Sequence, residues 1–406
     1  MLTALEQGVK GGKWYSLIDK VYPEATLRAA FREVSANEGA AGVDHVTIER
    51  FADDLDANLQ RLSEELCTGG YRAQAIRRHW ISKPGSQEKR PLGIPTVRDR
   101  VVQTALRLAL EPIFEKDFAQ HSYGFRPGRG CKDALRRVDE LLKAGYVHVV
   151  DADLKSYFDT IPHDRLLAEV GRKVTDGRLL RLLEGFLEQR IMDDAGAWTP
   201  EEGTPQGAVV SPLLSNIYLD PLDHLMAGQG FAMVRYADDF VVLCRSPHEA
   251  NAALAEVQRW TAPAGLTLHP TKTRLIDATK DGFDFLGYRF EGGRRRPRTK
   301  SLRKFKDAIR AKTGRTAGHS LSAIIGDLNR TLRGWFEYFK HSHRSTFPPL
   351  DGWIRRRLRN ILRKRHGRTG FSRGRDNIRW PNAYFAKQGL YSLRDAHAQA
   401  GQSCGR

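Results

Sequence analysis

Hydrophobic residues in the first half of the chain recur at helical spacing and then at strand spacing. Residues 25–65 predict helices around a polar turn, and residues 71–95 predict an extended hairpin. Helices over 101–118 and 132–145 follow, and the β-branched run at 147–154 predicts a buried strand. Because helices alternate with short strands, we predict an α+β fold with an antiparallel sheet.

The second half continues this alternation and then becomes helical. A helix over 209–225 precedes a hairpin at 233–243 and another helix over 247–265. The short stretches LTLH, TRLID and DFLGYRF predict further strands. Beyond a basic, glycine-containing boundary at 292–300, apolar residues three to four positions apart predict two amphipathic helices. These residues are Leu321, Ile325, Leu328, Leu332, Trp335 and Phe339, and then Leu350, Ile354, Leu358 and Ile361.

Positive charge is concentrated at one end of this pattern. The 406 residues carry a net charge of +18, but residues 294–379 contain 26 lysines and arginines against 5 acidic residues. That segment is therefore +21 and the remainder is −3. A solvated, charge-rich surface is one explanation, and a polyanionic partner such as nucleic acid is the other.

The remaining composition excludes several protein classes. The four cysteines are scattered and form no CxxC pair, which argues against a zinc module or a disulfide framework. No window is apolar enough for a membrane span, and the N-terminus lacks an apolar leader core. We therefore expect a cytoplasmic protein without a membrane partner, associated with the nucleoid when it is on DNA.

Two adjacent aspartates interrupt the apolar run MVRYADDFVVL. Asp238 and Asp239 could simply form a hairpin turn, in which Asp is common. However, VVDADLKSYFDTIPH carries Asp151 and Asp153 on one side of another predicted strand, and Asp153 lies at its end. If both strands share one sheet, Asp153 and Asp238 could converge on a pair of Mg²⁺ ions. Such an arrangement would suit phosphoryl transfer to a 3′-hydroxyl.

Taken in order, the motifs of the chain resemble those of group II intron-encoded reverse transcriptases with a maturase region, of the type that lacks an endonuclease. The blocks that carry the resemblance are NEGAAGVDHVTIERF, WISKPGSQEKRPLGIPTVRDRVVQ, HSYGFRPGRGCKDAL, VDADLKSYFDTIPH, GTPQGAVVSPLLSNIYLDPLD, RYADDFVVL, LTLHPTKT, DFLGYRF, LNRTLRGWFEYF and LDGWIRRRLRNIL. The chain ends without the His/Asn/Cys cluster of an HNH endonuclease, which puts independent second-strand cleavage in doubt.

This resemblance implies a right-hand polymerase with fingers and palm, followed by a basic helical thumb and maturase domain. The expected parts are an N-terminal extension over 1–70, fingers and palm over 71–292, the thumb and maturase (X) domain over 293–379, and a tail over 380–406. The implied activity is RNA-directed DNA synthesis with two Mg²⁺ ions. Its partners would be an RNA template, a DNA primer, deoxynucleoside triphosphates, a group II intron RNA and target DNA, with roles in splicing and retrohoming.

The resemblance also implies roles for individual residues. Asp153, Asp238 and Asp239 would be the catalytic, metal-binding carboxylates, with Asp239 the more peripheral. The nucleotide-binding residues would be Lys83, Arg90, Phe158, Gln206, Gly207 and Lys272. Lys83 and Arg90 would clamp the triphosphate, Phe158 would block a ribose 2′-hydroxyl, and Lys272 would protonate pyrophosphate. Each also has a plainer explanation: a solvated turn, a core aromatic, an ordinary loop or a charged strand edge.

The basic C-terminal helix would hold RNA through phosphates. Its candidate RNA-binding residues are Arg355, Arg356, Arg357, Arg359, Arg363, Lys364 and Arg365. Two other functions stay open at this point. One is an RNA-binding splicing cofactor in which polymerisation is dispensable, and the other is a domesticated, defence-associated reverse transcriptase. The cognate RNA and the oligomeric state do not follow from the sequence.

Overall fold

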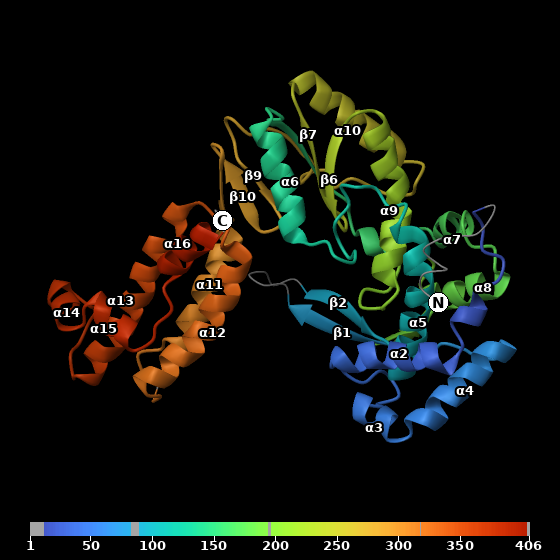
Figure 1. Cartoon of the computed structure of the whole chain (residues 1–406), viewed down its shortest axis with the longest axis horizontal. Helices are drawn as coiled ribbons and strands as arrows, with labels where there is room; N and C mark the ends of the chain where they lie inside the picture. Colours follow the sequence, from blue (N-terminus) through green and yellow to red (C-terminus); the bar gives the residue numbers. More distant parts are fainter. Residues whose placement is uncertain (1–11, 83–88, 194–195, 317, 404–406) are drawn as a thin grey trace. The chain divides into compact units, whose positions relative to one another are not determined.

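The structure is a computed structural model that describes residues 12–82, 89–193, 196–316 and 318–403. The chain forms two compact units, Met1–Asp277 and Ala278–Arg406 (Figure 1). Helices and antiparallel sheets occur in both, so the predicted α+β class is confirmed. None of the helices in the described ranges is long and apolar enough to cross a membrane.

The first unit is built largely from helices. They are η1 (Ile18–Lys20), α2 (Glu24–Ala36), α3 (Ile48–Asp53), α4 (Leu55–Thr68), α5 (Val97–Glu115), α6 (Cys131–Lys143), η2 (Tyr157–Asp159), α7 (His163–Gly171), α8 (Gly177–Leu187), α9 (Ser211–Gly228) and α10 (Pro247–Thr261). Several begin at a side chain that accepts a backbone N–H of the first turn, as Thr96 does for α5, Asp176 for α8 and Ser246 for α10.

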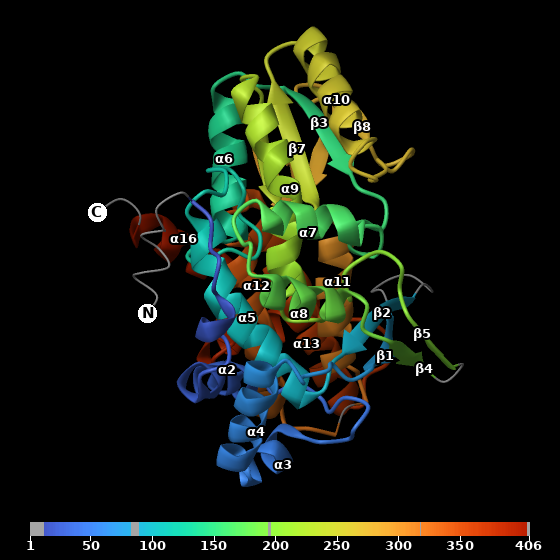
Figure 2. The ribbon, with the colours of Figure 1, turned by 90° about the vertical axis from the view of Figure 1, so that its right-hand side faces the viewer.

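A four-stranded antiparallel sheet forms the centre of this unit, in the order β6–β7–β3–β8. Its strands are β3 (His148–Asp153), β6 (Ala232–Tyr236), β7 (Asp239–Cys244) and β8 (Arg274–Asp277). Helices α6 and α9 contact β6, and α10 contacts β3 and β7 (Figure 2). From Phe240 to Cys244, every residue of β7 is buried, so this strand is covered on both faces. A continuous apolar run is expected of such a strand.

One predicted strand is shorter in the structure than the pattern suggested. LTLH forms only a single bridge, between Leu268 and Leu154. Nevertheless, it stays beside β3, because the backbone N–H of Lys155 donates to Thr267 O at 2.8 Å and that of His269 donates to Asp153 O at 2.7 Å. This segment therefore runs past the end of β3 and carries Lys272 toward it.

A second four-stranded sheet has the order β2–β1–β4–β5. Its strands are β1 (Ile76–Ser82), β2 (Lys89–Ile94), β4 (Ile191–Asp193) and β5 (Gly196–Trp198). The β1–β2 pair is antiparallel, with Ile81 opposite Arg90, and this confirms the predicted hairpin at 71–95. The turn of that hairpin, including Lys83, lies outside the described residues.

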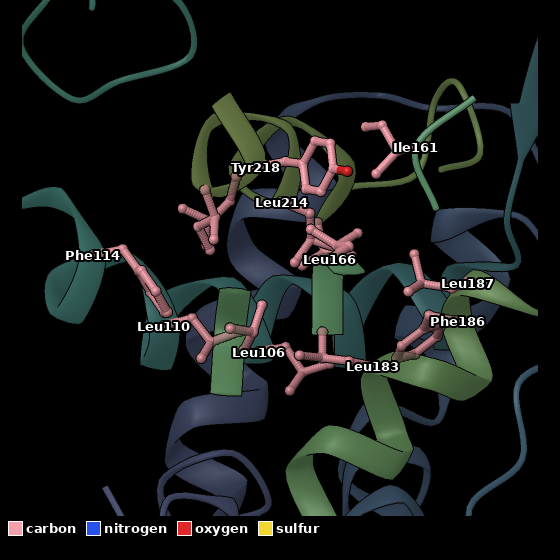
Figure 3. Close-up of a cluster of buried hydrophobic side chains, with 14 of the residues drawn as sticks. Leu106, Leu110, Phe114, Ile161, Leu166, Leu183, Phe186, Leu187, Leu214 and Tyr218 are labelled. Atoms are coloured by element: carbon pink, nitrogen blue, oxygen red, sulfur yellow. The ribbon is translucent and has the colours of Figure 1, made fainter. Parts of the chain in front are cut away.

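The main hydrophobic core of the first unit lies between helices. Figure 3 shows labelled side chains of α5, α7, α8 and α9 meeting there. Leu106 and Leu110 come from α5, Leu166 from α7, Leu183 from α8, and all four are fully buried. The segments around 160 and 205 lead into α7 and α9, so the packing of these helices positions them.

The second unit combines a small sheet with a helical bundle. The antiparallel strands are β9 (Phe283–Phe285), β10 (Tyr288–Glu291) and β11 (Arg294–Pro297). The helices are α11 (Thr299–Lys312), α12 (Leu321–Phe339), η3 (Arg344–Thr346), α13 (Phe347–Arg365), α14 (Gly374–Arg379), α15 (Asn382–Lys387) and α16 (Leu393–Ser403). The predicted apolar stripes are buried at Ile325, Leu328 and Leu332 and again at Ile354 and Leu358. Both amphipathic helices are thus confirmed.

The C-terminal segment belongs to the same core. Phe385 and Leu393 are fully buried with the α12 and α13 stripes. Asp351 of α13 accepts the backbone N–H groups of Leu393 and Arg394 at 3.0 and 3.1 Å, which satisfies the first turn of α16. A carboxylate at a helix N-terminus is also favoured by the helix dipole.

Asp376 provides a test of how the second unit depends on pH. It is fully buried, and accepts the backbone N–H of Arg373 at 2.8 Å and the Arg363 guanidinium at 3.0 Å. These two donors lower the pKa of Asp376. Its stabilising contribution is therefore present above the unfolded pKa of about 3.9 and is lost as the pH falls through the lower folded pKa.

We predict that Asp376→Asn destabilises this region by about 1–3 kcal/mol at pH 7. Amide hydrogen exchange over 355–380 should accelerate at pH 7. In denaturant unfolding below pH 4 the difference from the unsubstituted chain should shrink, because Asp376 becomes protonated first in the unfolded state and, at still lower pH, in the folded state. An equal difference in the free energy of unfolding at both pH values would show that the charge of Asp376 does not contribute to stability.

Candidate active site

The two aspartates of MVRYADDFVVL lie at a tight hairpin between β6 and β7. Tyr236 pairs with Asp239, which leaves Ala237 and Asp238 as the two loop residues. Ala237 has a φ of 58°, a value that costs a residue with a side chain on the order of 1–2 kcal/mol. The predicted hairpin is confirmed, but its turn is strained, and such strain persists only where the surroundings impose it.

A third aspartate lies directly beside this turn. Strands β3 and β7 are neighbours in one sheet, and their register places Asp153 opposite Asp239. The condition for convergence of Asp153 and Asp238 is therefore met. Burial raises the pKa of Asp238, and the negative charge of Asp153 acts in the same direction. Crowded carboxylates of this kind repel each other unless a cation lies between or beside them.

Lys272 is a cation already at this position. Its Nζ lies 2.8 Å from Asp153 Oδ2, although both side chains remain well exposed. An exposed pair of this kind adds little to stability, so it can break when another cation or a phosphate arrives. Asp151, on the same side of β3, pairs with Arg274 at 3.1 Å. The Arg274 guanidinium thus faces the Asp151 carboxylate.

The strained turn is held from inside by Arg235. Its side chain is fully buried and donates to both carboxylate oxygens of Asp223, to Asn216 Oδ1 at 2.9 Å and to the carbonyl of Ala237 at 2.9 Å. Burial alone would lower the pKa of Arg235, but the Asp223 carboxylate outweighs it and the pKa is raised. Helix α9 carries both Asp223 and Asn216, so it fixes the residue that precedes Asp238.

The SYGF segment supports the same turn from another side. The backbone N–H of Arg235 donates to His121 O at 3.0 Å, and that of Tyr123 donates back to Arg235 O at 2.9 Å. Gly124 then passes so close to the turn that a Cβ atom there would clash with the backbone nitrogen of Ala237. Asn216 Nδ2 also donates to Gly124 O at 2.8 Å. These contacts explain why glycine is needed at position 124.

The candidate nucleotide-binding residues lie on adjoining segments. Phe158 is half-buried in η2 and packs edge-on against Tyr157, with ring centroids 5.5 Å apart. The 203–207 loop is tied to that turn, because the backbone N–H of Thr204 donates to Phe158 O at 2.6 Å. Gln206 Nε2 donates to both carboxylate oxygens of Asp159, at 3.0 and 3.1 Å.

The same loop contacts the second sheet. The backbone N–H of Gly93 in β2 donates to Gln206 O at 2.6 Å. Gly207 has a φ of 107°, and a Cβ atom there would clash with the carbonyl oxygen of Gly93. A pocket of about 210 Å³ is lined by this loop, by Asp159 and by β1 and β2. Arg90 lies exposed on β2, three residues before Gly93.

The candidate RNA-binding residues of α13 do not share one environment. Arg356, Lys364 and Arg365 are exposed, and Arg355 is half-buried. Arg357 donates to Thr313, and Arg365 donates to the carbonyl of His319. Arg359 is buried and donates to Trp380 O at 2.9 Å, while Arg363 is paired with Asp376 at 3.0 Å. Arg359 and Arg363 thus hold the polypeptide that follows α13.

The aspartates can be compared with the ligands that a divalent metal ion requires. Within the described ranges, no three His, Cys, Asp or Glu side chains form a group that could hold a metal ion by themselves. Mg²⁺, however, is usually held by one or two carboxylates together with water and substrate phosphates. Asp153 and Asp238 supply carboxylate oxygens whose mutual repulsion a cation would relieve. These residues therefore fit a Mg²⁺ site completed by substrate.

Comparison with known proteins adds the following findings. The family model described as reverse transcriptase (RNA-dependent DNA polymerase) matches residues 81–290, and the model described as group II intron, maturase-specific domain matches residues 302–380. Protein YkfC of Escherichia coli is 34% identical over 340 residues, which cover 74% of this chain and 88% of that protein. The group II intron-encoded protein LtrA of Lactococcus lactis is 36% identical over 196 residues, 48% of this chain and 32% of LtrA.

A solved structure gives a weaker likeness. One chain of a partial Cas6-RT-Cas1–Cas2 complex is 26% identical, and the match covers 61% of this chain and 41% of that chain with a TM-score of 0.38. This chain thus spans most of one curated relative and about a third of another.

The buried Arg235–Asp223 pair generates a prediction about stability. Asp223→Ala leaves the fully buried guanidinium without its counter-charge, and we expect a loss of about 3–5 kcal/mol in the free energy of unfolding of the first unit. The double variant Arg235→Met/Asp223→Leu removes both charges and should lose less than Asp223→Ala alone.

Urea unfolding followed by circular dichroism measures both effects. Asp56→Ala is the matched control, because Asp56 forms an exposed pair with Arg28 and its loss should cost no more than about 1 kcal/mol. If Asp223→Ala cost as little as Asp56→Ala, the pair would not hold the turn.

Proposed function

The chain belongs to the reverse transcriptase (RNA-dependent DNA polymerase) family and carries a group II intron maturase-specific domain, and from this premise we propose that Asp153, Asp238 and Asp239 are its catalytic carboxylates. The family predicted from the sequence is thus confirmed. The observation that carries the site proposal is the strand register, which places the end of β3 against the β6–β7 turn. The reaction is addition of deoxynucleotides to a primer 3′-hydroxyl on an RNA template.

In this proposal Asp153 and Asp238 hold two Mg²⁺ ions, and Asp239 contributes from its exposed position at the start of β7. Divalent ions, when bound, supply the positive charge that favours ionisation of the attacking hydroxyl and neutralises the departing pyrophosphate. The protein itself contributes by holding the metal-binding groups in position. Arg235 fixes the carbonyl that precedes Asp238, and α9 fixes Arg235, so the backbone of Asp238 is held in position before reaction.

The remaining residues form the nucleotide site of the proposal. Phe158 blocks the space of a ribose 2′-hydroxyl, and Gln206 and Gly207 contact the incoming nucleotide and template from the loop that is hydrogen-bonded to both η2 and β2. Arg90 binds the triphosphate as a planar cation. Lys272 leaves Asp153 to donate a proton to pyrophosphate. Lys83 is assigned the second phosphate contact, and its position lies outside the described residues.

The second unit is proposed to bind RNA. Its net charge and the match to the maturase-specific domain support contact with the template–primer duplex and with a group II intron RNA. We propose that the exposed Arg356, Lys364 and Arg365, with Arg355 and Arg357, contact phosphates, and that Arg359 and Arg363 support the segment beside them. Splicing and retrohoming, with target DNA as a partner, follow from the same proposal.

The functional parts expected from the sequence remain part of this proposal. They are the extension over 1–70, fingers and palm over 71–292, the thumb and maturase domain over 293–379 and the tail over 380–406. The β9–β11 sheet lies in the compact unit that begins at Ala278. The alternative function is an RNA-binding splicing cofactor with a dispensable polymerase. The observation that favours it is the basic second unit.

The catalytic proposal predicts the effect of neutralising Asp238. Asp238→Asn keeps the size of the side chain but removes the charge needed for metal binding, so primer extension on an RNA template should fall by at least about 10²-fold. Asp151→Asn is the matched control, since Asp151 lies on the same side of β3 and pairs with Arg274. It should lose only a few-fold. Equal activity of Asp238→Asn and the unsubstituted chain would refute the assignment of Asp238. If the unsubstituted chain itself bound RNA but did not extend a primer, the splicing-cofactor function would be favoured.

The assignment of Phe158 predicts a change in sugar selectivity. Phe158→Ala opens the space beside the sugar, so the ratio of ribonucleotide to deoxynucleotide incorporation should rise by about tenfold or more. Tyr157→Phe removes the neighbouring hydroxyl, which donates to Ser215 O, and leaves the ring in place. Single-nucleotide extension with each triphosphate measures both. A ratio that is the same in Phe158→Ala and Tyr157→Phe would remove Phe158 from this role.

A further inference from the structure

The second unit contains a basic pocket of about 650 Å³ between α13 and the segment 371–377. It lies entirely within the residues that match the maturase-specific domain. Its lining includes Arg356, Arg357, Arg359 and Arg373, and no acidic side chain among the described residues lines it. Positive charge of this density in a concave surface favours an anionic ligand.

The charges near the pocket repel one another. Burial lowers the pKa of Arg357, and the neighbouring Arg310 and Arg315 act in the same direction. A bound phosphate would relieve this repulsion. Arg356 and Arg373 are both exposed at the pocket, so their guanidinium groups can reach such a ligand.

Two aromatic side chains add a second feature to the pocket. Trp353 has three cations around its indole ring, with Arg357, Arg310 and Lys306 at 5.6, 5.8 and 6.0 Å from the centroid. Phe371 is 69% exposed, and the Arg315 guanidinium lies 5.1 Å from its ring centroid. An exposed phenylalanine adds little to folding, but its face is well suited to stack on a base.

The wall that carries Phe371 is fixed to α13. Asn360 Oδ1 accepts the backbone N–H of Ser372 at 2.7 Å. Arg363 and Arg373 are both bonded to the fully buried Asp376, through the side chain and the backbone respectively. The aromatic and cationic groups are therefore presented by anchored backbone, which lowers the entropy cost of binding.

We propose that this pocket binds an unpaired nucleotide of the RNA held by the second unit. The phosphate lies against Arg356 and Arg373, and the base stacks on Phe371. The inference rests on the proposed RNA-binding function and deepens it, because proteins recognise single-stranded RNA through splayed bases stacked on aromatic and guanidinium planes. A paired strand cannot present its base in this way, so the pocket selects single-stranded over duplex RNA.

Binding of a fluorescent single-stranded oligoribonucleotide to the full chain tests the proposal. Phe371→Ala should weaken binding by about tenfold, since stacking on one aromatic contributes that order of affinity. Phe371→Trp should restore binding, whereas Phe371→Leu should not, because leucine is apolar but has no π face. Thermal unfolding of the three variants shows whether each is folded, and the exposed position of Phe371 predicts that all are.

The phosphate contacts have a separate readout. Arg356→Ala/Arg373→Ala should reduce the slope of log affinity against log salt by about 1.4, at about 0.7 for each contact with single-stranded RNA. Arg330→Ala is the control for loss of a surface arginine, because Arg330 lies on α12, outside the pocket, and pairs with Asp327. Its salt slope should match that of the unsubstituted chain.

The proposal is overturned by unchanged affinity in Phe371→Ala, by equal binding of Phe371→Leu and Phe371→Trp, or by a loss of affinity of Phe371→Ala for blunt duplex RNA that equals its loss for single-stranded RNA. A loss only for single-stranded DNA would also overturn it. Primer extension by the unsubstituted chain tests the catalytic proposal independently. The proposal for the pocket can thus be wrong while the polymerase assignment is right. The polymerase assignment can likewise be wrong while the pocket binds RNA.

Discussion

The fully buried ion pair between Arg235 and Asp223 is the interaction on which the candidate active site depends. A guanidinium without exposure to water must have all its charge compensated inside the protein. Here a carboxylate and an amide of α9 provide that compensation, and a further N–H of Arg235 reaches the carbonyl of Ala237. Consequently one helix determines where the strained turn, and with it Asp238, can lie.

This arrangement links stability and chemistry across the first unit. Helix α9 packs in the core with α5, α7 and α8, so the position of Asp223 is set by many apolar contacts (Figure 3). The SYGF segment adds a further limit, because Gly124 leaves no room for the turn to move toward it. The acidic end of the sheet is thus rigid on the protein side, while the exposed Lys272–Asp153 contact lies on its open side. A rigid carboxylate cluster beside an easily broken ion pair is suited to bind cations and phosphates in turn.

The sequence predicted the local structure of this site well, because local structure depends on spacing. Alternation of apolar residues located β3 and the β6–β7 hairpin, and helical spacing located α12 and α13. The partners of Arg235 were not predicted, because Asn216 and Asp223 lie 19 and 12 residues away and meet it only in the folded unit. The indication was present nevertheless, since an arginine in an apolar strand that is buried on both faces requires a counter-charge. Likewise, a helical pattern gives the apolar face of α13 but cannot show that Arg359 turns inward to Trp380.

The proposed active site requires divalent metal to bind at the end of β3 beside the β6–β7 turn. Replacing Mg²⁺ with Fe²⁺ and generating hydroxyl radicals at the bound ion cuts the polypeptide close to the metal, and mass spectrometry locates the cuts. With primer, template and nucleotide bound, we expect cleavage near Asp153 and around Ala237–Asp239, and competition by excess Mg²⁺. Cleavage elsewhere in the chain, with these two segments intact, would show that the metal does not bind at the end of β3.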